Sequence, residues 1–162
     1  MLVAAALAAL LVPAAMASAQ SHGAHQEMNA RGAEAMGFDQ EKTTHHFRLY
    51  PDGGAIEVVV RDAADAASLE AIRAHLPHIA HSFGEGDFAL PHFIHATDVP
   101  GTVDLARLRS RVTYRYEAQD RGGRVRIVTA DAEALAALHA FLRFQIQDHR
   151  TGDSLEVTRP PA

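Results

Sequence analysis

The sequence predicts an α+β domain in which one ββα unit occurs twice. Two observations carry this prediction. A Gly-Gly pair, Gly53-Gly54 and again Gly122-Gly123, stands between two β-rich runs each time, and an amphipathic helical stretch follows each second run. A single ββα unit cannot bury its own apolar face. We therefore expect the two units to join into a four-stranded antiparallel sheet with two helices on one face.

Alternation of apolar and polar residues predicts the strands, because it gives each strand one buried face. Asp52-Gly53-Gly54 is expected to supply the positive φ of a tight hairpin. The opposite face of the sheet is polar except for Val59 and Val128, which we interpret as a partner surface. The inward strand positions are His45, Phe47, Leu49, Ile56, Val58, Val60, Val112, Tyr114, Tyr116, Val125 and Ile127.

Apolar residues at helical spacing predict the two helices. Asp62 is the expected N-cap of the first, because its carboxylate can accept from free amides. Pro77 is expected to bend this helix, since an interior proline costs about 3 kcal/mol. The apolar stripes are Leu69, Ile72, Leu76, Ile79 and Phe83 in the first helix, and Leu135, Leu138, Leu142 and Ile146 in the second.

The ends of the chain differ from this core in composition. Residues 1–19 are uncharged and apolar and end in Ala17-Ser18-Ala19, the pattern of a cleaved secretory signal peptide, although no basic residue precedes the apolar run. The run is too short to span a bilayer, which needs about 20 apolar residues. Export to the periplasm or the outside, with no membrane span after cleavage, is therefore expected.

The remaining chain divides by pattern. Residues 20–39 are interpreted as a flexible lead that contains His and Met, residues 40–157 as the single α+β domain, and residues 158–162 as a tail. Within the domain, repeat one covers residues 43–87 and repeat two covers residues 111–153. The linker between them, residues 88–110, is expected to contain an extended piece at 93–95 and a short helix at 103–109.

Histidine is the compositional anomaly of the chain. There are 11 His and no Cys, and the formal net charge is −5. The negative charge argues against nucleic acid as a partner, since phosphate binding needs a basic surface. Without thiolates, a metal ion would be held by His, Met or carboxylate, and imidazole suits copper and zinc.

His45, His75 and His78 are the first metal-site candidates. His45 points inward from the first strand, and His75 and His78 are neighbours on the first helix. The three could meet between sheet and helix. The competing interpretation makes each an ordinary surface or core histidine.

Met36, His46 and His95 complete the candidate ligands. Met36 follows a segment with His22, His25 and Met28, and thioether with imidazole is a ligand set for Cu(I). Alternation directs His46 to the opposite sheet face, so it could share an ion with His45 only across a bulge. His95 lies in the piece read as extended. Copper is the favoured ion, zinc is the alternative, and no organic cofactor is expected.

Catalytic motifs do not appear in the sequence. It contains no Gly-x-Ser-x-Gly elbow, Walker loop or dinucleotide fingerprint. The sequence thus favours an exported metal-binding protein for copper handling or sensing over an enzyme. The alternatives are a protein–protein interaction module or homodimer built on the duplicated sheet and, less favoured, a small hydrolase using His and a carboxylate.

Several long runs resemble a family of small exported bacterial proteins of uncharacterised function. The runs include Met36-Gly-Phe-Asp-Gln, Thr44-His-His-Phe-Arg-Leu and Phe141-Leu-Arg-Phe-Gln-Ile-Gln-Asp-His-Arg-Thr-Gly-Asp. The resemblance covers about residues 28 to 153 and implies the fold and export. Some relatives carry a carbamoyltransferase label, but that enzyme needs two α/β domains and a phosphate-binding loop, which do not fit this chain.

Overall fold

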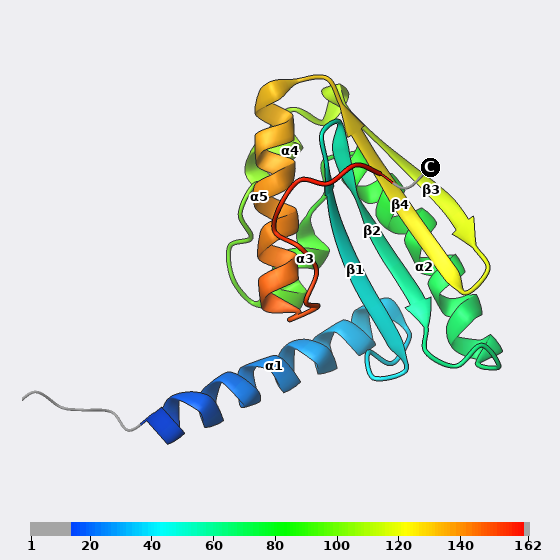
Figure 1. The fold of residues 1–162 in the computed structure, drawn as a ribbon, viewed down its shortest axis with the longest axis vertical. Coiled ribbons are helices and arrows are strands. Elements are labelled where there is room, and N and C mark those ends of the chain that lie inside the picture. Colours follow the sequence, from blue (N-terminus) through cyan, green and yellow to red (C-terminus); the bar gives the residue numbers. More distant parts are fainter. Residues whose placement is uncertain (1–13, 161–162) are drawn as a thin grey trace, which may run out of the picture.

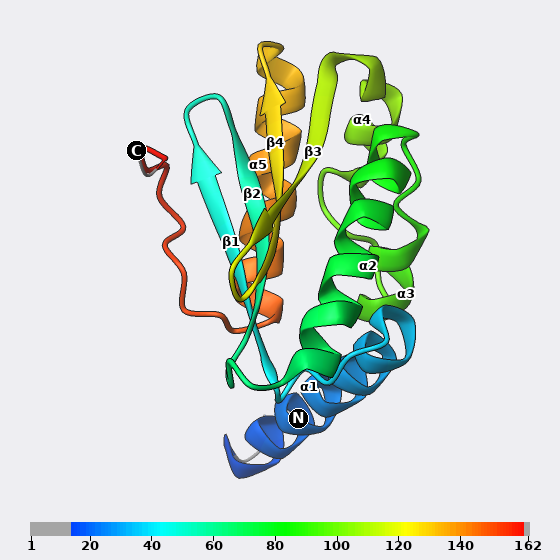
Figure 2. The ribbon, with the colours of Figure 1, turned by 90° about the vertical axis from the view of Figure 1, so that its right-hand side faces the viewer.

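The computed structural model describes residues 14–160 and forms a four-stranded sheet flanked by helices (Figures 1 and 2). The elements in chain order are α1 (Ala14–Met36), β1 (Thr43–Tyr50), β2 (Gly53–Val60), α2 (Ala66–Gly84), α3 (Ala89–His95), α4 (Thr102–Arg107), a 3-10 turn (Arg109–Arg111), β3 (Val112–Gln119), β4 (Gly122–Thr129) and α5 (Ala132–Asp148). The predicted α+β class and antiparallel sheet are confirmed.

The register of the sheet reflects the sequence duplication. The strand order is β1-β2-β4-β3, so the second strands of the two repeats pair at the centre. Gly53 of β2 pairs with Val128 of β4, and Val59 of β2 pairs in the same way with Gly122 of β4. Ile56 pairs with Val125, its own counterpart in the other repeat. The two hairpins are therefore related by a pseudo-twofold axis near this pair.

The repeat helices α2 and α5 each pack mainly on the hairpin of the other repeat. Helix α2 contacts β3 and β4, whereas α5 contacts mainly β1 and β2. This exchange gives both repeats one shared core, because each hairpin is covered mainly by the helix of the other repeat. The buried core contains most of the predicted inward positions, including Phe47, Leu49, Ile56, Val58, Val60, Ile72, Leu76, Ile79, Phe83, Val112, Val125, Ile127, Leu138, Leu142 and Ile146.

The Gly-Gly pairs act differently from the prediction. Tyr50 pairs with Gly53, so the first turn consists of Pro51 and Asp52, and both glycines belong to β2. Gly53 has the positive φ of 147°, but its counterpart Gly122 does not have a positive φ. A positive φ is therefore not the reason why both repeats have glycine at this position.

Close approach of the two central strands explains why these positions are glycine. A Cβ on Gly53 would lie 2.0 Å from the carbonyl oxygen of Ile127, and one on Gly122 would lie 1.9 Å from that of Val58. Any side chain at either position would push β2 and β4 apart. The duplicated glycines thus maintain the central strand pairing that joins the two repeats.

The N-terminal segment differs from the predicted flexible lead. Residues 14–36 form α1, in which Met28 is buried and the guanidinium of Arg31 donates to the carbonyl oxygen of Ile94 at 2.8 Å. The segment lacks apolar periodicity but is rich in Ala, Glu and Gln, which favour helix. Most of the predicted signal peptide lies outside the described residues, and that interpretation stays a prediction.

Two further local predictions were wrong. Residues 93–95 belong to helix α3 rather than an extended piece, and Asp87 precedes this helix and accepts from the amide of Ala89 at 2.9 Å. The N-cap of α2 is Asp65, not Asp62, because the Asp65 carboxylate accepts from the amide of Ser68 at 3.0 Å. The short helix predicted at 103–109 is present as α4 and the turn that follows it.

The segment after α5 is tied to the edge strand β1 through Asp153. The carboxylate of Asp153 is 5% exposed and accepts from the amide of Phe47 at 3.0 Å and from the guanidinium of Arg48 at 2.7 Å. His46 Nδ1 lies 3.0 Å from the same carboxylate. Further along, the amide of Thr158 donates to the carbonyl oxygen of Leu49 at 2.9 Å. The C-terminal segment therefore covers the β1 edge.

Replacing Asp153 with alanine is expected to lower the free energy of unfolding by about 2 kcal/mol, because the Arg48 guanidinium and the edge amide of Phe47 lose a buried acceptor. Urea denaturation of Asp153→Ala measures the loss. Asp98→Ala, at an exposed position, is the matched control and should change stability by less than about 0.5 kcal/mol. Equal stabilities of the two variants would contradict a stabilising role for Asp153.

Candidate functional site

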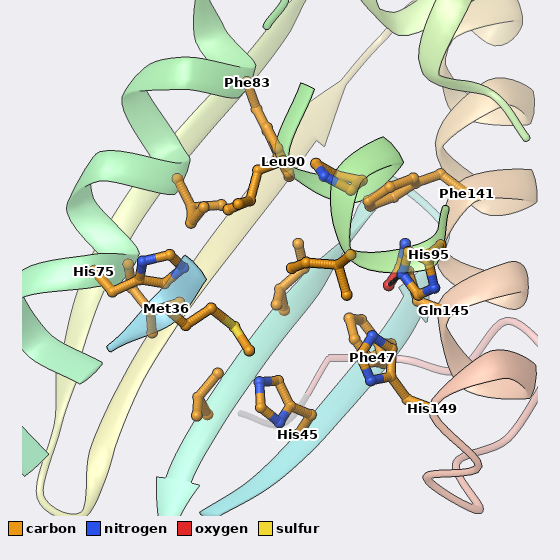
Figure 3. A pocket seen from close by; sticks show the side chains of 16 residues that line it. Met36, His45, Phe47, His75, Phe83, Leu90, His95, Phe141, Gln145 and His149 are labelled. Carbon is orange, nitrogen blue, oxygen red and sulfur yellow. Dashed lines mark hydrogen bonds between the residues drawn. The ribbon is translucent and has the colours of Figure 1, made fainter. Parts of the chain in front are cut away.

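A largely apolar pocket lies between the sheet and the helices (Figure 3). Its empty space, with the adjoining solvent, amounts to about 540 Å³. The wall is built by β1, β2, α2, α3 and α5, and the end of α1 contributes one side chain. The lining residues are Met36, His45, Phe47, Ile56, Val58, His75, Leu76, Ile79, Phe83, Leu90, Pro91, Ile94, His95, Phe141, Gln145 and His149.

His45 enters this pocket from β1, as strand alternation predicted. Its Nε2 atom is buried and has no hydrogen-bond partner among the described residues. Burial lowers the pKa of His45 to about 4, and repulsion by His75 and His46 contributes in the same direction. The ring is therefore neutral at physiological pH, and a buried imidazole nitrogen is left without a partner inside an apolar pocket. Such an atom is costly to bury unless a ligand satisfies it.

Met36 and His75 lie on the side of the pocket formed by α1 and α2. Figure 3 shows the Met36 side chain between the rings of His75 and His45, with its sulfur on the side of His45. Burial, with a smaller contribution from His78, lowers the pKa of His75 to about 4. Phe38 contacts both rings, with centroids 6.0 Å from His45 and 5.8 Å from His75. Two neutral imidazoles and a thioether therefore share one pocket.

His149 and His95 lie on the opposite side. The ring of His149, at the C-terminal end of α5, stacks on His45 with centroids 5.7 Å apart, and His95 meets His149 edge-on at 5.0 Å. The three imidazoles form a row along one wall of the pocket. This row joins β1, α5 and α3, three elements distant from one another in sequence.

His95 is held by hydrogen bonds at both ring nitrogens. Its Nδ1 lies 2.5 Å from the Asp148 carboxylate, and its Nε2 lies 3.0 Å from the Gln145 side-chain oxygen. An Asp–His pair occurs in hydrolases, but there the second nitrogen faces a nucleophile. Here it faces an amide, and we do not propose a hydrolase. Both nitrogens of His95 are also engaged, so it is a poor candidate ligand in this arrangement.

The structure separates the predicted ligands into two groups. Met36, His45, His75 and His95 line the pocket, whereas His78 is exposed on α2 and His46 lies on the opposite sheet face beside Asp153. Within residues described by the structure, no group of three or more His, Asp or Glu side chains could hold a metal ion. Of the three histidines expected to meet, His45 and His75 line the pocket and His78 does not. The helix turns His78 away, and strand alternation turns His46 away.

Sequence reasoning missed Phe38, Gln145 and the pocket role of His149. Phe38 follows α1 in a segment read as flexible, and its contact with two histidines depends on tertiary folding. Gln145 is buried, and its Nε2 atom has no hydrogen-bond partner within the described chain. The sequence does carry a signal for Gln145. It is a polar residue on the apolar stripe of α5, at helical spacing from Leu138 and Leu142.

Comparison with protein-family models, curated proteins and solved structures found no match to the chain. In the part of the chain that the structure describes, no helix is both long and apolar enough to cross a membrane.

Proposed function

We propose that the chain is an exported copper-binding protein that holds Cu(I) in this pocket through His45 and Met36, with His75 as a third ligand. The observation that carries the proposal is the buried Nε2 of His45, which has no hydrogen-bond partner in the described part of the chain and lies in a pocket that also contains a thioether. Export rests on the predicted signal peptide. Copper handling or sensing is the corresponding role.

The chemistry of the donor set favours Cu(I) over zinc. Thioether and imidazole ligands suit Cu(I), whereas structural zinc sites are tetrahedral and use thiolate, imidazole or carboxylate. The described part of the chain contains no group of three such zinc ligands. The apolar wall supports the same choice, because a pocket without carboxylates suits a singly charged, soft ion better than a divalent one.

The low pKa values make the two imidazoles available as ligands. A histidine must be neutral to bind a metal ion, and protons compete at pH values near or below its pKa. His45 and His75, with pKa values of about 4, remain neutral through the mildly acidic range.

Competition for Cu(I) against a chromogenic chelator, under anaerobic reducing conditions, tests the proposal. The wild-type chain should bind one equivalent, and His45→Phe and Met36→Leu should each weaken binding at least about 10-fold. The matched control is His78→Phe, which alters an exposed histidine of α2 outside the pocket and should leave the affinity unchanged. Binding by wild type that is no tighter than by the His45→Phe/Met36→Leu double variant would exclude the site.

A second control separates the pocket from the N-terminal segment. His22→Ala/His25→Ala removes the other His-containing candidate near Met28, and it should leave the pocket affinity intact. If this variant loses the tight equivalent while His45→Phe keeps it, copper binds the N-terminal segment and the proposed pocket site is wrong.

The pH dependence of Cu(I) affinity provides an independent prediction. Between pH 7.5 and 5.5 the affinity should change by less than about 3-fold, because the pKa values of His45 and His75 lie near 4. Imidazoles of ordinary pKa, about 6.5, would lose roughly 10-fold each over the same interval. The competition titration repeated at the two pH values measures the difference, and a steep loss would show that other histidines bind the ion.

One observation favours a second candidate function, the binding of a small, mostly apolar molecule. The pocket holds two buried side-chain nitrogens, on His45 and Gln145, that have no hydrogen-bond partner among residues 14–160, and its wall is largely apolar. This combination is typical of ligand pockets. Native mass spectrometry of the purified chain distinguishes the candidates: a retained organic mass released by His45→Phe favours a small molecule, whereas a copper adduct favours the metal site.

A further inference from the structure

The two edges of the sheet are equivalent by duplication but differ in what covers them. The outer backbone groups of β1 are bound by the C-terminal segment, at the Phe47 amide and the Leu49 carbonyl. The counterparts of these residues in β3 are Tyr116 and Ala118. In repeat one the chain after α2 turns into α3, where Asp87, the counterpart of Asp153, accepts from the amide of Ala89 at the start of that helix. In residues 14–160, no segment therefore makes the corresponding backbone contacts along β3.

The arrangement of the elements shows the same asymmetry. Figure 2 shows the C-terminal segment beside β1, on the far side of the sheet from β3. In Figure 1, β3 is the outermost strand of the sheet at the side opposite β1. An uncovered edge strand presents a row of backbone donors and acceptors, which another strand can pair with.

The hairpin register identifies the backbone groups that point outward from β3. Gln119 and Gly122 flank the two-residue turn, and such a closing pair exchanges hydrogen bonds within the hairpin. Alternation along the strand then directs the N–H and C=O groups of Tyr114, Tyr116 and Ala118 away from β4. Within the described chain these groups have no backbone partner, so an antiparallel strand could pair with them.

We propose that β3 pairs antiparallel with β3 of a second copy, so that two sheets join across a twofold axis at Tyr116. Charge selects this register. When Tyr116 lies opposite Tyr116 of the second copy, Arg115 of each chain lies opposite Glu117 of the other. Two oppositely charged pairs then form, one on each side of the twofold axis. The neighbouring allowed registers place Arg115 opposite Arg115 or Glu117 opposite Glu117, and directly opposed like charges are destabilising.

Both charged residues stand on the wet face of the sheet. Arg115 is exposed and Glu117 is half-buried. Glu117 already accepts from the guanidinium of Arg124 of its own chain at 2.8 Å. That contact directs the carboxylate toward β4 on the wet face, and the partner's long Arg115 side chain would reach it across the new strand pair. The dimer does not depend on the copper proposal, because the pocket lies on the helix-covered face.

Sedimentation equilibrium of protein purified after expression of the full chain tests the interface. Wild type should have the mass of a dimer. Arg115→Glu, which makes the edge uniformly acidic, and Glu117→Arg, which makes it uniformly basic, should each raise the dissociation constant more than about 10-fold. Mixing the two variants should restore a dimer, since every Glu of one edge then faces an Arg of the other.

The mixing experiment separates an interface effect from misfolding. A variant that failed to fold would not recover a dimeric mass when mixed with the other. Glu41→Arg, an exposed charge reversal remote from β3, is the matched control and should leave the wild-type dimer intact. A monomeric wild type, a dimer that persists in both variants, or variants that stay monomeric on mixing would each overturn the proposal.

Discussion

Replacing Gly122 with alanine is expected to lower the free energy of unfolding by more than about 4 kcal/mol, the range reached when a change disrupts a central contact. The new Cβ would lie 1.9 Å from the carbonyl oxygen of Val58 and 2.9 Å from the Cα of Val59. Both atoms belong to the backbone of the paired strand β2, so no flexible side chain can move aside. Relief requires β2 and β4 to separate, and this pairing joins the two repeats.

Denaturant unfolding and the yield of folded protein measure the effect. Gly53→Ala should behave in the same way, because its Cβ would lie 2.0 Å from the carbonyl oxygen of Ile127. Gly84→Ala, at the end of α2 with no atom within 4 Å of the added Cβ, is the control and should be neutral or stabilise by up to about 1 kcal/mol. A Gly122→Ala protein as stable as the Gly84→Ala protein would show that the strands tolerate separation.

Acidification from pH 7 to pH 5 is expected to destabilise the fold by roughly 2 kcal/mol for each of His45 and His75. Their folded-state pKa values are about 4, below the usual value of 6.5. In this interval the unfolded chain binds more protons than the folded one. The free energy of unfolding is therefore unaffected by these two rings above pH 6.5 and falls as the pH drops from 6.5 toward 4. Below pH 4 the two rings cause no further loss.

The double variant His45→Phe/His75→Phe isolates this effect from the titration of carboxylates. It retains every other ionisable group, so its unfolding free energy should fall less between pH 7 and pH 5 than that of wild type. Urea denaturation at the two pH values gives both slopes. Parallel losses in wild type and the double variant would mean that the two rings are solvated and titrate normally.

The strand pattern was predictable because alternation is a local property. His45, Phe47 and Val58 face the helices as period-two spacing requires, and the duplication predicted the sheet. Two features could not be obtained in this way. Which helix covers which hairpin depends on the long-range exchange of α2 and α5. Helix α3 escaped prediction because it is short and contains Pro91.

The candidate site was predicted only in part, for the same reason. The inward direction of His45 follows from its strand, and His75 at the edge of an apolar stripe follows from its helix. The approach of Met36 depends on where α1 ends against the domain, and the stacking of His149 on His45 depends on how α5 crosses β1. Asp153 repeats the Gly-Asp pattern of Asp87, and only the fold distinguishes the buried carboxylate of Asp153 from the Asp87 carboxylate, which binds the first amide of α3.

X-ray absorption at the copper edge tests most directly whether His45 and Met36 together hold Cu(I). The Cu(I)-loaded wild-type chain should show both sulfur and imidazole nitrogen among the nearest neighbours of copper. The sulfur contribution should disappear in Met36→Leu and persist in Met28→Leu. A wild-type spectrum with nitrogen and oxygen neighbours alone, or sulfur that remains in Met36→Leu, would contradict the proposed site.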